Sequence, residues 1–295
     1  MEVRQAKSAG FCFGVARAVK MAQELAASAQ RPRMLGTVIH NDHVIGDLAR
    51  QGMQVYQTPE EAQPGDSVLL RAHGVGRRVY EELEARGAQV VDATCPKVAR
   101  VQQIVRDADR EGRQPVMIGD PKHPEVIGVG GWCENLLVFP GPEELEQWLE
   151  SVDNRDFLAL TVVSQTTLIR KNWESSLKIL KKLCTNLKIF DTICSATSTR
   201  QSEAAQIASE VDAMVVVGDP QSANTKHLTE ICRLHCSRVF QIESADELPR
   251  TELSDRAVVG LTAGASTPAS IIKEVNKTMS EEKILGEENF AEMFE

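Results

Sequence analysis

Two short patterns of the form Asp-x-x-Cys constrain this chain most, because each stands at the end of a predicted strand and before a predicted helix. They are Asp92-Ala-Thr-Cys95 and Asp191-Thr-Ile-Cys194. Cys12 also precedes a segment of helical periodicity. A pattern that recurs at long spacing indicates a repeated structural unit. We therefore expect three similar units, each with a cysteine at the start of a helix.

Short β-branched runs alternate with longer segments of helical periodicity along the chain. This alternation is typical of β-α-β units with parallel sheet, so the expected fold class is α/β. The expected strands are 34–39, 67–72, 90–93, 115–118, 158–163, 189–191, 213–217, 239–242 and 257–261. The expected helices include 15–27, 98–109, 173–183, 200–210 and 268–278.

The module boundaries are expected close to two of the cysteines. The first α/β module spans residues 1–95 with an N-terminal strand and Cys12, the second spans 96–194, and the third spans 195–279. Residues 280–295 carry six glutamates against one lysine. This composition predicts an acidic tail or linker without fixed structure.

Composition limits the class of protein. The chain has seven cysteines and no export signal at its start, so these thiols are expected in a reducing cytoplasm and not in disulfides. No run approaches the roughly 20 apolar residues of a membrane span. The formal net charge of −9 gives no general attraction for nucleic acid or for an anionic membrane. An anionic ligand therefore needs a local site.

Cys12, Cys95 and Cys194 are candidate metal ligands. The positive end of a helix dipole favours the thiolate, which is the form that binds metal. Soft thiolates suit an iron-sulfur cluster or zinc, and the fold must assemble the site because no compact Cys-x-x-Cys pair is present. Three thiolates leave one iron of a cubane cluster without a protein ligand, which indicates chemistry at that iron.

The remaining cysteines and three histidines are expected to have structural roles. They are Cys133, Cys184, Cys232, Cys236, His43, His227 and His235. A zinc site built from Cys232, His235 and Cys236 is an alternative.

Six loops after predicted strands carry polar side chains. The carboxyl ends of parallel strands form the ligand-binding edge of α/β folds. Imidazole, hydroxyl, amide and backbone N–H donors can hold a diphosphate without lysine, and the absence of dinucleotide and P-loop motifs favours a small ligand. The loops contain His40-Asn41, His73-Gly74, His123-Pro124-Glu125, Gln165-Thr166-Thr167, Ser222-Ala223-Asn224 and Ala263-Gly264-Ala265-Ser266.

Eight motifs between residues 3 and 278 together resemble those of the 4-hydroxy-3-methylbut-2-enyl diphosphate reductase family, also called the LytB family. They are AGFCFGV at 9–15, VIHN at 38–41, AHGV at 72–75, DATCP at 92–96, HPEV at 123–126, SQTTL at 164–168, ICSAT at 193–197 and TAGAS at 262–266. The resemblance implies three α/β modules in a pseudo-threefold (trefoil) arrangement around a 4Fe-4S cluster. The implied cluster ligands are Cys12, Cys95 and Cys194, with one iron left open.

The resemblance also implies an activity, which is the reductive dehydroxylation of an allylic diphosphate to isopentenyl and dimethylallyl diphosphate. This reaction completes the methylerythritol phosphate route, and ferredoxin or flavodoxin is the implied electron donor. Glu125 and Thr166 would lie beside the substrate hydroxyl, with Glu125 in the proton path. The implied diphosphate ligands are His40, His73, His123, Ser222, Asn224 and Ser266.

Two features depart from the family pattern, namely Ala223 in place of a second serine and the pair Asp219-Pro220. We expect weaker diphosphate binding before altered chemistry. The acidic tail resembles a linker that joins some family members to S1-like RNA-binding repeats. Two other readings stay open from the residues alone, an aconitase-like iron-sulfur hydratase and an iron-sulfur redox sensor.

Overall fold

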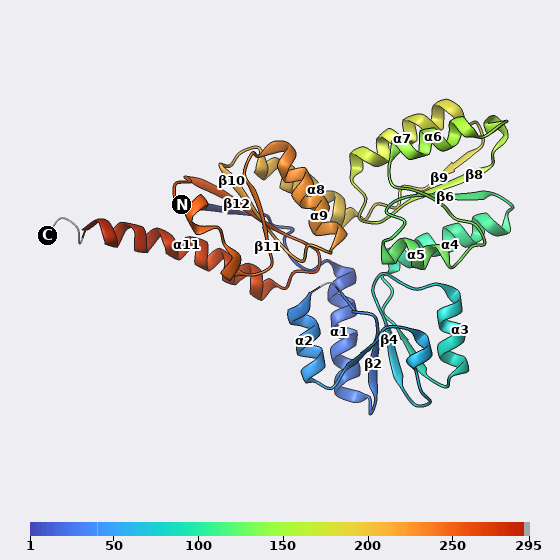
Figure 1. Ribbon diagram of the computed structural model, residues 1–295, viewed down its shortest axis with the longest axis horizontal. Helices are drawn as coiled ribbons and strands as arrows, with labels where there is room; N and C mark the ends of the chain where they lie inside the picture. The colour runs from blue at the N-terminus through green and yellow to red at the C-terminus, as the bar shows by residue number, and fades with distance from the viewer. Residues whose placement is uncertain (40, 292–295) are drawn as a thin grey trace. The chain divides into compact units, whose positions relative to one another are not determined.

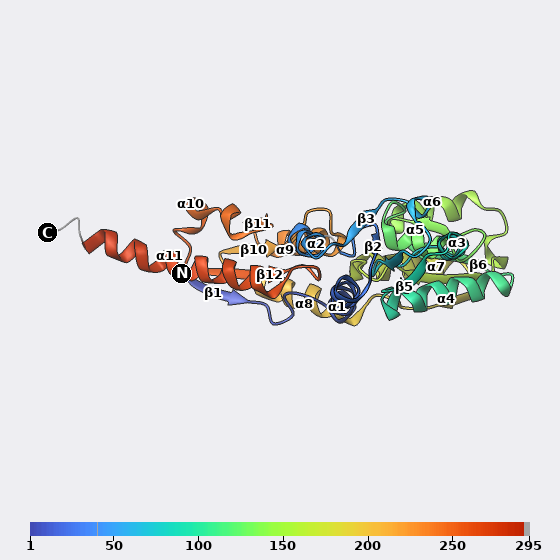
Figure 2. The ribbon, with the colours of Figure 1, turned by 90° about the horizontal axis from the view of Figure 1, so that it is seen from below.

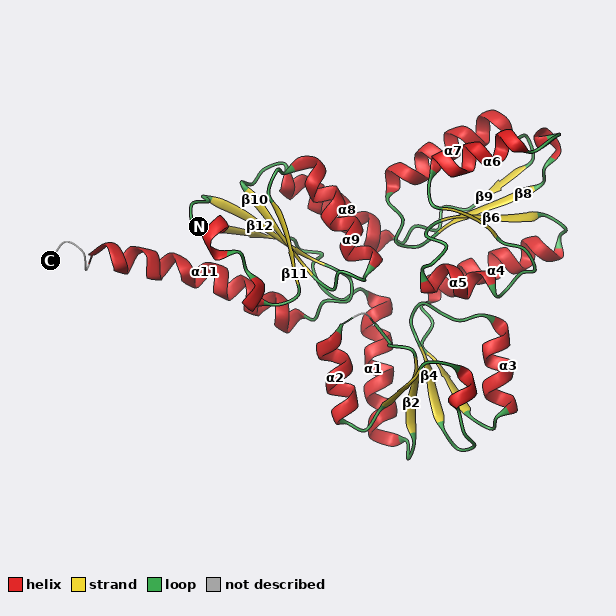
Figure 3. Ribbon diagram, viewed as in Figure 1, coloured by secondary structure: helices red, strands yellow, loops and turns green. Residues whose placement is uncertain are grey.

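Three parallel sheets of four strands each organise the chain (Figures 1 and 3). The computed structural model describes residues 1–39 and 41–291, with side-chain surroundings described to residue 281. The described residues divide into two compact units, one formed by Phe13–Cys194 and the other by Met1–Cys12 together with the segment from Ser195 onward. The α/β class and the three similar modules are confirmed.

The first sheet of the unit 13–194 has the strand order β3-β2-β4-β5. Its strands are β2 (Pro32–Leu35), β3 (Gln54–Tyr56), β4 (Ser67–Leu70) and β5 (Gln89–Asp92), all parallel. Its helices are α1 (Phe13–Ser28), α2 (Asp42–Arg50), the short η1 (Pro59–Glu61) and α3 (Arg77–Ala85). Alternate residues of β4 point to one face, where Val68 and Leu70 pack with Leu83 of α3.

The second sheet of this unit has the order β7-β6-β8-β9. Its elements are α4 (Pro96–Arg110), β6 (Gln114–Ile118), α5 (Pro124–Gly130), β7 (Leu137–Phe139), α6 (Pro142–Ser151), η2 (Arg155–Phe157), β8 (Leu160–Ser164), α7 (Arg170–Leu183) and β9 (Leu187–Ile189). Val162 of β8 packs with Leu149 of α6 and Trp173 of α7, whereas its neighbour Val163 packs with Val101 of α4. Helices therefore cover both faces of the sheet (Figure 3).

The loop after β4 and the end of α5 pack closely against each other at glycine residues. A Cβ atom on Gly131 would lie 2.5 Å from the Cα of Gly76, and one on Gly128 would lie 2.7 Å from the carbonyl oxygen of Gly74. The indole N–H of Trp132 donates to the carbonyl of Val75 at 2.9 Å. The backbones approach closely because these positions lack side chains.

The other unit contains a sheet with the order β1-β12-β10-β11. Its elements are β1 (Glu2–Gln5), α8 (Ser195–Ala208), β10 (Ala213–Val217), α9 (Ala223–His235), β11 (Val239–Ile242), η3 (Ala245–Glu247), α10 (Arg250–Leu253), β12 (Val258–Ala263) and α11 (Ala269–Ala291). Val215 of β10 packs with Ile271 and Val275 of α11, and Val216 packs on the opposite face with Ala204 of α8 and Leu228 of α9.

Two expectations about the ends of the chain are wrong. The N-terminal strand does not belong to the first module, because β1 pairs with β12, with Val3 opposite Val259. The hydrogen bonds of a strand are set by the available sheet edge and not by closeness in sequence. Helix α11 also continues through Ala291, past the expected end at residue 278 and into the predicted tail. Lys277 and Glu281, one turn apart, form an ion pair of 3.5 Å that favours this continuation.

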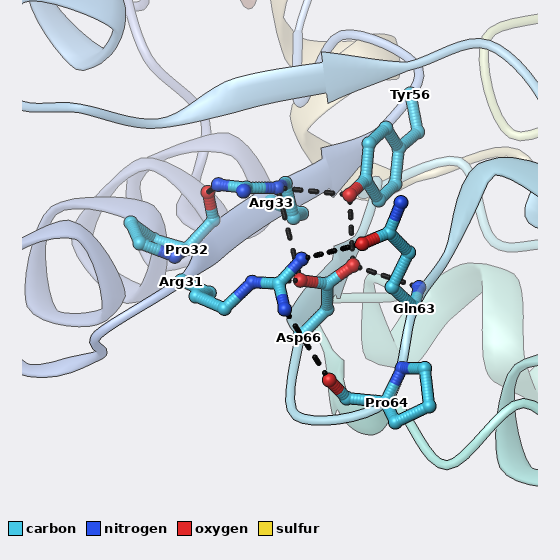
Figure 4. A network of polar contacts seen from close by, with 7 residues as sticks. All are labelled: Arg31, Pro32, Arg33, Tyr56, Gln63, Pro64 and Asp66. Atoms are coloured by element: carbon cyan, nitrogen blue, oxygen red, sulfur yellow. Dashed lines mark hydrogen bonds and ion pairs between the residues drawn. The ribbon is translucent and has the colours of Figure 1, made fainter.

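A buried carboxylate lies where β2 and β4 begin, at the edge of the first sheet opposite the polar loops (Figure 4). The Asp66 side chain accepts hydrogen bonds from the Tyr56 hydroxyl at 2.7 Å and the Gln63 N–H at 2.9 Å. The Nε atoms of Arg31 and Arg33 lie 2.8 and 3.9 Å from its Oδ1. Burial opposes the charge, but the hydrogen bonds and the two cations outweigh it and lower the pKa of Asp66. This network anchors the sheet.

Within the described part of the chain, no helix has the length and apolar character needed to cross a membrane.

Candidate functional site

Three cysteines stand immediately before the first helix of a module, as expected. Cys12 precedes α1, Cys95 is the N-cap residue of α4, and Cys194 precedes α8. All three side chains are partly exposed. A thiolate at such a position is favoured by the helix dipole and is accessible to a metal. The donor chemistry of the three residues therefore fits an iron-sulfur cluster.

The loop after β4 brings His73 next to Cys95 and to the second sheet. The backbone N–H of Cys95 donates to the carbonyl of Ala72 at 2.9 Å. The imidazole rings of His73 and His123 meet edge to face, with their centroids 5.4 Å apart. Two of the predicted diphosphate ligands thus lie together at one end of this unit.

His123 caps helix α5 with its own ring. Its Nδ1 atom accepts the backbone N–H of Glu125 at 3.1 Å. In a neutral imidazole one nitrogen accepts and the other carries the proton, so this bond assigns the proton to Nε2. His123 is also buried. The local fold therefore fixes a ring with a defined hydrogen-bond donor.

Glu125, in the first turn of α5, and Thr166, in the turn that follows β8, form a buried pair. The Thr166 hydroxyl donates to Oε2 of Glu125 at 2.6 Å, and the Thr166 backbone N–H donates to Oε1 at 2.7 Å. The Glu125 side chain is only 2% exposed. Burial raises the pKa of Glu125 to about 7, although both hydrogen bonds from Thr166 act in the opposite direction. This carboxyl can hold or release a proton near neutral pH.

Cys194 lies beside the same pair, because its backbone N–H donates to the carbonyl of Thr166 at 3.0 Å. The contacts form a continuous series from Cys95 past His73 and His123 to Glu125, Thr166 and Cys194. Sequence positions from 73 to 194 therefore meet at the carboxyl edge of the two sheets, which is where a parallel α/β fold binds its ligands.

In the other unit, Ser222, Asn224 and Ser266 lie at the carboxyl ends of β10 and β12. These strands are neighbours, and the N–H of Gly264 donates to the carbonyl of Val217 at 2.9 Å. All three polar side chains are buried. The amide nitrogen of Asn224 and the hydroxyl of Ser266 have no hydrogen-bond partner among the described residues. Because buried donors without partners are costly, these two groups are candidates for binding a ligand.

Cys12 lies at this edge of the same sheet, since its backbone N–H donates to the carbonyl of Ala265 at 3.3 Å. Two charged residues of α8 hold the segment that precedes Cys12. Glu203 accepts the backbone N–H groups of Lys7 at 2.7 Å and Ser8 at 2.9 Å, and the guanidinium of Arg200 donates to the carbonyl of Gly10. Sequence reasoning missed Arg200 and Glu203, because they are separated from this segment by most of the chain.

The residues that depart from the family pattern have local roles. Asp219 accepts the N–H of Gln221 at 2.6 Å, so its carboxylate closes its own loop. Ala223 is the first residue of α9. His40 lies outside the residues that the structure describes.

The zinc alternative on α9 is not supported. Cys232 is buried in the core with Leu228, and burial raises the pKa of its thiol to about 12. The thiol of Cys236 donates to the carbonyl of Arg238 at 3.3 Å. Among the described residues around α9, no three histidine, cysteine or acidic side chains are grouped to hold a metal. These cysteines are core residues.

Comparison with known proteins gives consistent matches along the chain. The sequence model of the LytB protein family matches residues 3–280. A 4-hydroxy-3-methylbut-2-enyl diphosphate reductase of Caldanaerobacter subterraneus subsp. tengcongensis is 41% identical over an alignment of 280 residues, and the alignment covers 93% of this chain and 95% of that protein.

Two solved structures are similar to this one. A structure of (E)-4-hydroxy-3-methyl-but-2-enyl diphosphate reductase, described as the terminal enzyme of the non-mevalonate pathway, has 35% identity and a TM-score of 0.69, with 95% of this chain and 100% of that chain covered. The E-1-hydroxy-2-methyl-but-2-enyl-4-diphosphate reductase of Plasmodium falciparum has a TM-score of 0.87 at 24% identity, with 94% and 87% covered. The second likeness is one of fold.

Proposed function

This chain belongs to the LytB protein family, and from that premise we propose that it reduces 4-hydroxy-3-methylbut-2-enyl diphosphate to isopentenyl and dimethylallyl diphosphate. The reaction replaces a C–OH bond by a C–H bond. It consumes two electrons and two protons and releases water. The proposed step is the last one of the non-mevalonate route to isoprenoid precursors, as the description of the similar structure suggests.

The buried pair of Glu125 and Thr166 is the observation that supports this proposal most. A departing hydroxyl leaves as water only when a proton reaches its oxygen. A carboxyl with a pKa of about 7 keeps that proton available at neutral pH, which an ordinary exposed glutamate does not. Glu125 is therefore the proposed proton donor, and Thr166 holds it in place and orients the substrate hydroxyl.

Cys12, Cys95 and Cys194 are the proposed ligands of a 4Fe-4S cluster. When bound, such a cluster with one open iron supplies electrons and a Lewis acid for the hydroxyl oxygen. The position of each cysteine before a helix, with its thiol partly exposed, supports this assignment. The remaining steps fall to the side chains around the substrate.

Six polar side chains are the proposed diphosphate ligands, namely His40, His73, His123, Ser222, Asn224 and Ser266. The Nε2 proton of His123 and the buried amide and hydroxyl donors of Asn224 and Ser266 support this role. Imidazole, hydroxyl and amide donors can bind phosphate oxygens without a general positive charge on the protein. This suits a chain of net charge −9.

Anaerobic turnover tests the proposal. The purified protein with a reconstituted cluster would receive the allylic diphosphate and reduced methyl viologen, and both isoprenoid diphosphates would be measured. We expect products from the wild type and none from Cys194→Ser. A protein with an intact cluster that gives no product would refute the proposed function and return attention to the hydratase and sensor readings.

A further inference from the structure

We propose that the surface where α1 and α4 begin is the docking site of a small acidic protein that carries one electron at a time. This inference rests on the proposed function, which consumes two electrons for each hydroxyl removed. The substrate does not supply these two electrons. A reduced carrier must therefore donate one electron in each of two encounters and leave in its oxidised form.

This surface lies next to Cys95, a proposed cluster ligand. Arg17 of α1 donates to the carbonyl of Thr94 at 3.2 Å and to that of Asp92 at 3.4 Å, so the first turns of α1 contact the segment that leads into Cys95. Cys95 itself is the N-cap of α4 and is partly exposed. Figure 2 shows α1 and α4 along the same lower side of this unit. A carrier bound here lies beside the group that must accept its electrons.

The charge of this surface is opposite to that of the whole chain. From Pro96 to Arg106 helix α4 carries basic side chains and no acidic one, and Lys97 and Arg100 are exposed. Helix α1 likewise carries two basic side chains, Arg17 and Lys20, and no acidic one from residue 13 to residue 23. The nearby Asp92 carboxylate accepts the Tyr80 hydroxyl and the Thr94 N–H, both at distances of 2.8 to 2.9 Å. A positive surface on a chain of net charge −9 selects an acidic partner and speeds its approach.

An exposed aromatic residue adds the apolar contact that such an interface needs. Phe13, the first residue of α1, is 75% exposed, and four residues further along the helix Arg17 lies on the same side. An aromatic side chain surrounded by charges is typical of interfaces that form and dissociate during turnover. The combination fits a carrier protein better than a nucleic acid, which needs phosphate contacts over a longer surface.

Charge reversal at Lys97 and Arg100 tests the docking site, and the same change at Lys181 and Lys182 in the last turn of α7 is the matched control. The two double variants, Lys97→Glu with Arg100→Glu and Lys181→Glu with Lys182→Glu, have equal net charge. Affinity would be measured at low salt with a redox-inert, gallium-substituted ferredoxin, and turnover with native ferredoxin and with reduced methyl viologen.

We expect the first variant to bind the inert carrier at least about tenfold more weakly and to show a raised KM for native ferredoxin. High salt should narrow this difference, because it screens the charges. Turnover with methyl viologen should match the wild type. Equal losses in both variants, or unchanged affinity in the first, would overturn the docking site. Because affinity needs no turnover, a wild type that is inactive with methyl viologen counts against the proposed function alone.

Discussion

The carboxyl of Glu125 combines two properties that an exposed glutamate lacks, namely a proton at neutral pH and a fixed direction. Both come from its place in the first turn of α5, where Thr166 of the turn after β8 donates to both of its oxygens. We expect Glu125→Gln to lower kcat by about 100-fold or more, since the amide keeps the shape but cannot give up the proton. Substrate affinity should change little. Single-turnover kinetics in the presence of an intact cluster would measure this, and unchanged turnover would remove Glu125 from the proton path.

The assignment of the proton to Glu125 also predicts how kcat changes with pH. The donor must be protonated, so wild-type kcat should fall as pH rises through about 7, the pKa of Glu125. The residual rate of Glu125→Gln should lack this fall. A wild-type profile that stays flat between pH 6 and 8 would contradict the assignment of the proton to this carboxyl.

The same pKa makes a second prediction, on stability. The pKa of Glu125 is raised from 4.5 to about 7 in the folded protein, so between these values the folded state keeps a proton that the unfolded state has lost. Stability should therefore fall as pH rises across this range, by up to about 3 kcal/mol. Glu125→Gln should show a smaller fall, because its amide does not titrate. Urea unfolding of both proteins at pH 5 and pH 7.5 measures the change in the free energy of unfolding between the two pH values. An equal change in the wild type and in Glu125→Gln would contradict the raised pKa of this carboxyl.

At the residue scale, the sequence predicts the site residues that stand in local motifs but not the contacts between distant segments. Cys95 and Cys194 could be placed from Asp-x-x-Cys and from the helical periodicity that follows, and Cys12 from that periodicity alone, because both features are local. The contact of Arg200 with Gly10 and that of Glu203 with Ser8 could not, since they depend on β1 joining a sheet formed at the other end of the chain. The buried state of Asn224 likewise depends on the pairing of β10 with β12.

At the scale of elements, the close contact between Gly76, after β4, and Gly131, after α5, holds together the two segments that carry His73 and His123. Gly131 has a φ of −71°, which alanine also adopts, so only space limits substitution there. A methyl group 2.5 Å from the Cα of Gly76 would push two backbone segments apart. We expect Gly131→Ala to lower the free energy of unfolding by about 1 to 3 kcal/mol.

Gly46→Ala is the matched control for this prediction. Gly46 lies inside α2, and the nearest atom to its added Cβ is the end of the Arg50 side chain at 3.6 Å. Alanine should there leave stability unchanged or raise it by up to about 1 kcal/mol through helix propensity. Thermal unfolding of the two variants separates the effects. A Gly131→Ala protein as stable as the wild type would mean that the two loops move apart freely.

Element prediction succeeded where a pattern was long and failed where it was short. Strands β10 and β11 have the predicted bounds. The run in β10 is continuously apolar and ends at Gly218, which makes that strand the clearer of the two. Strands β3 and β7 have three residues each, too few for a period of two to show. Helix α8 begins at Ser195, before the predicted start at residue 200, since its first turn is rich in serine and threonine, which are poor helix formers.

On the scale of the whole molecule, the first residues of the chain complete a sheet made by the last hundred. Strand β1 covers the edge of β12, and Met1 and Val3 pack against the core that contains Val275 and Met279. Glu203 binds the turn that follows β1. Without these residues β12 would present an unpaired edge, which favours aggregation. The unit is therefore continuous in space but not in sequence.

A permuted fragment tests this closure. Residues 195–281 joined by a short glycine-serine linker to residues 1–12 restore β1 to its edge. Met1 packs against the core cluster that contains Met279, and the Asn276 side chain donates to that of Gln5 at 2.7 Å, so β1 and α11 lie close enough for a linker to connect them. We expect this fragment to unfold cooperatively by circular dichroism and to give a dispersed amide NMR spectrum, whereas residues 195–281 alone should be less stable by several kcal/mol or should aggregate. The permuted fragment with Val3→Asp is a control, because a partly buried charge opposite Val259 should cancel the gain. Equal stability of all three fragments would show that β1 adds nothing to the fold of this unit.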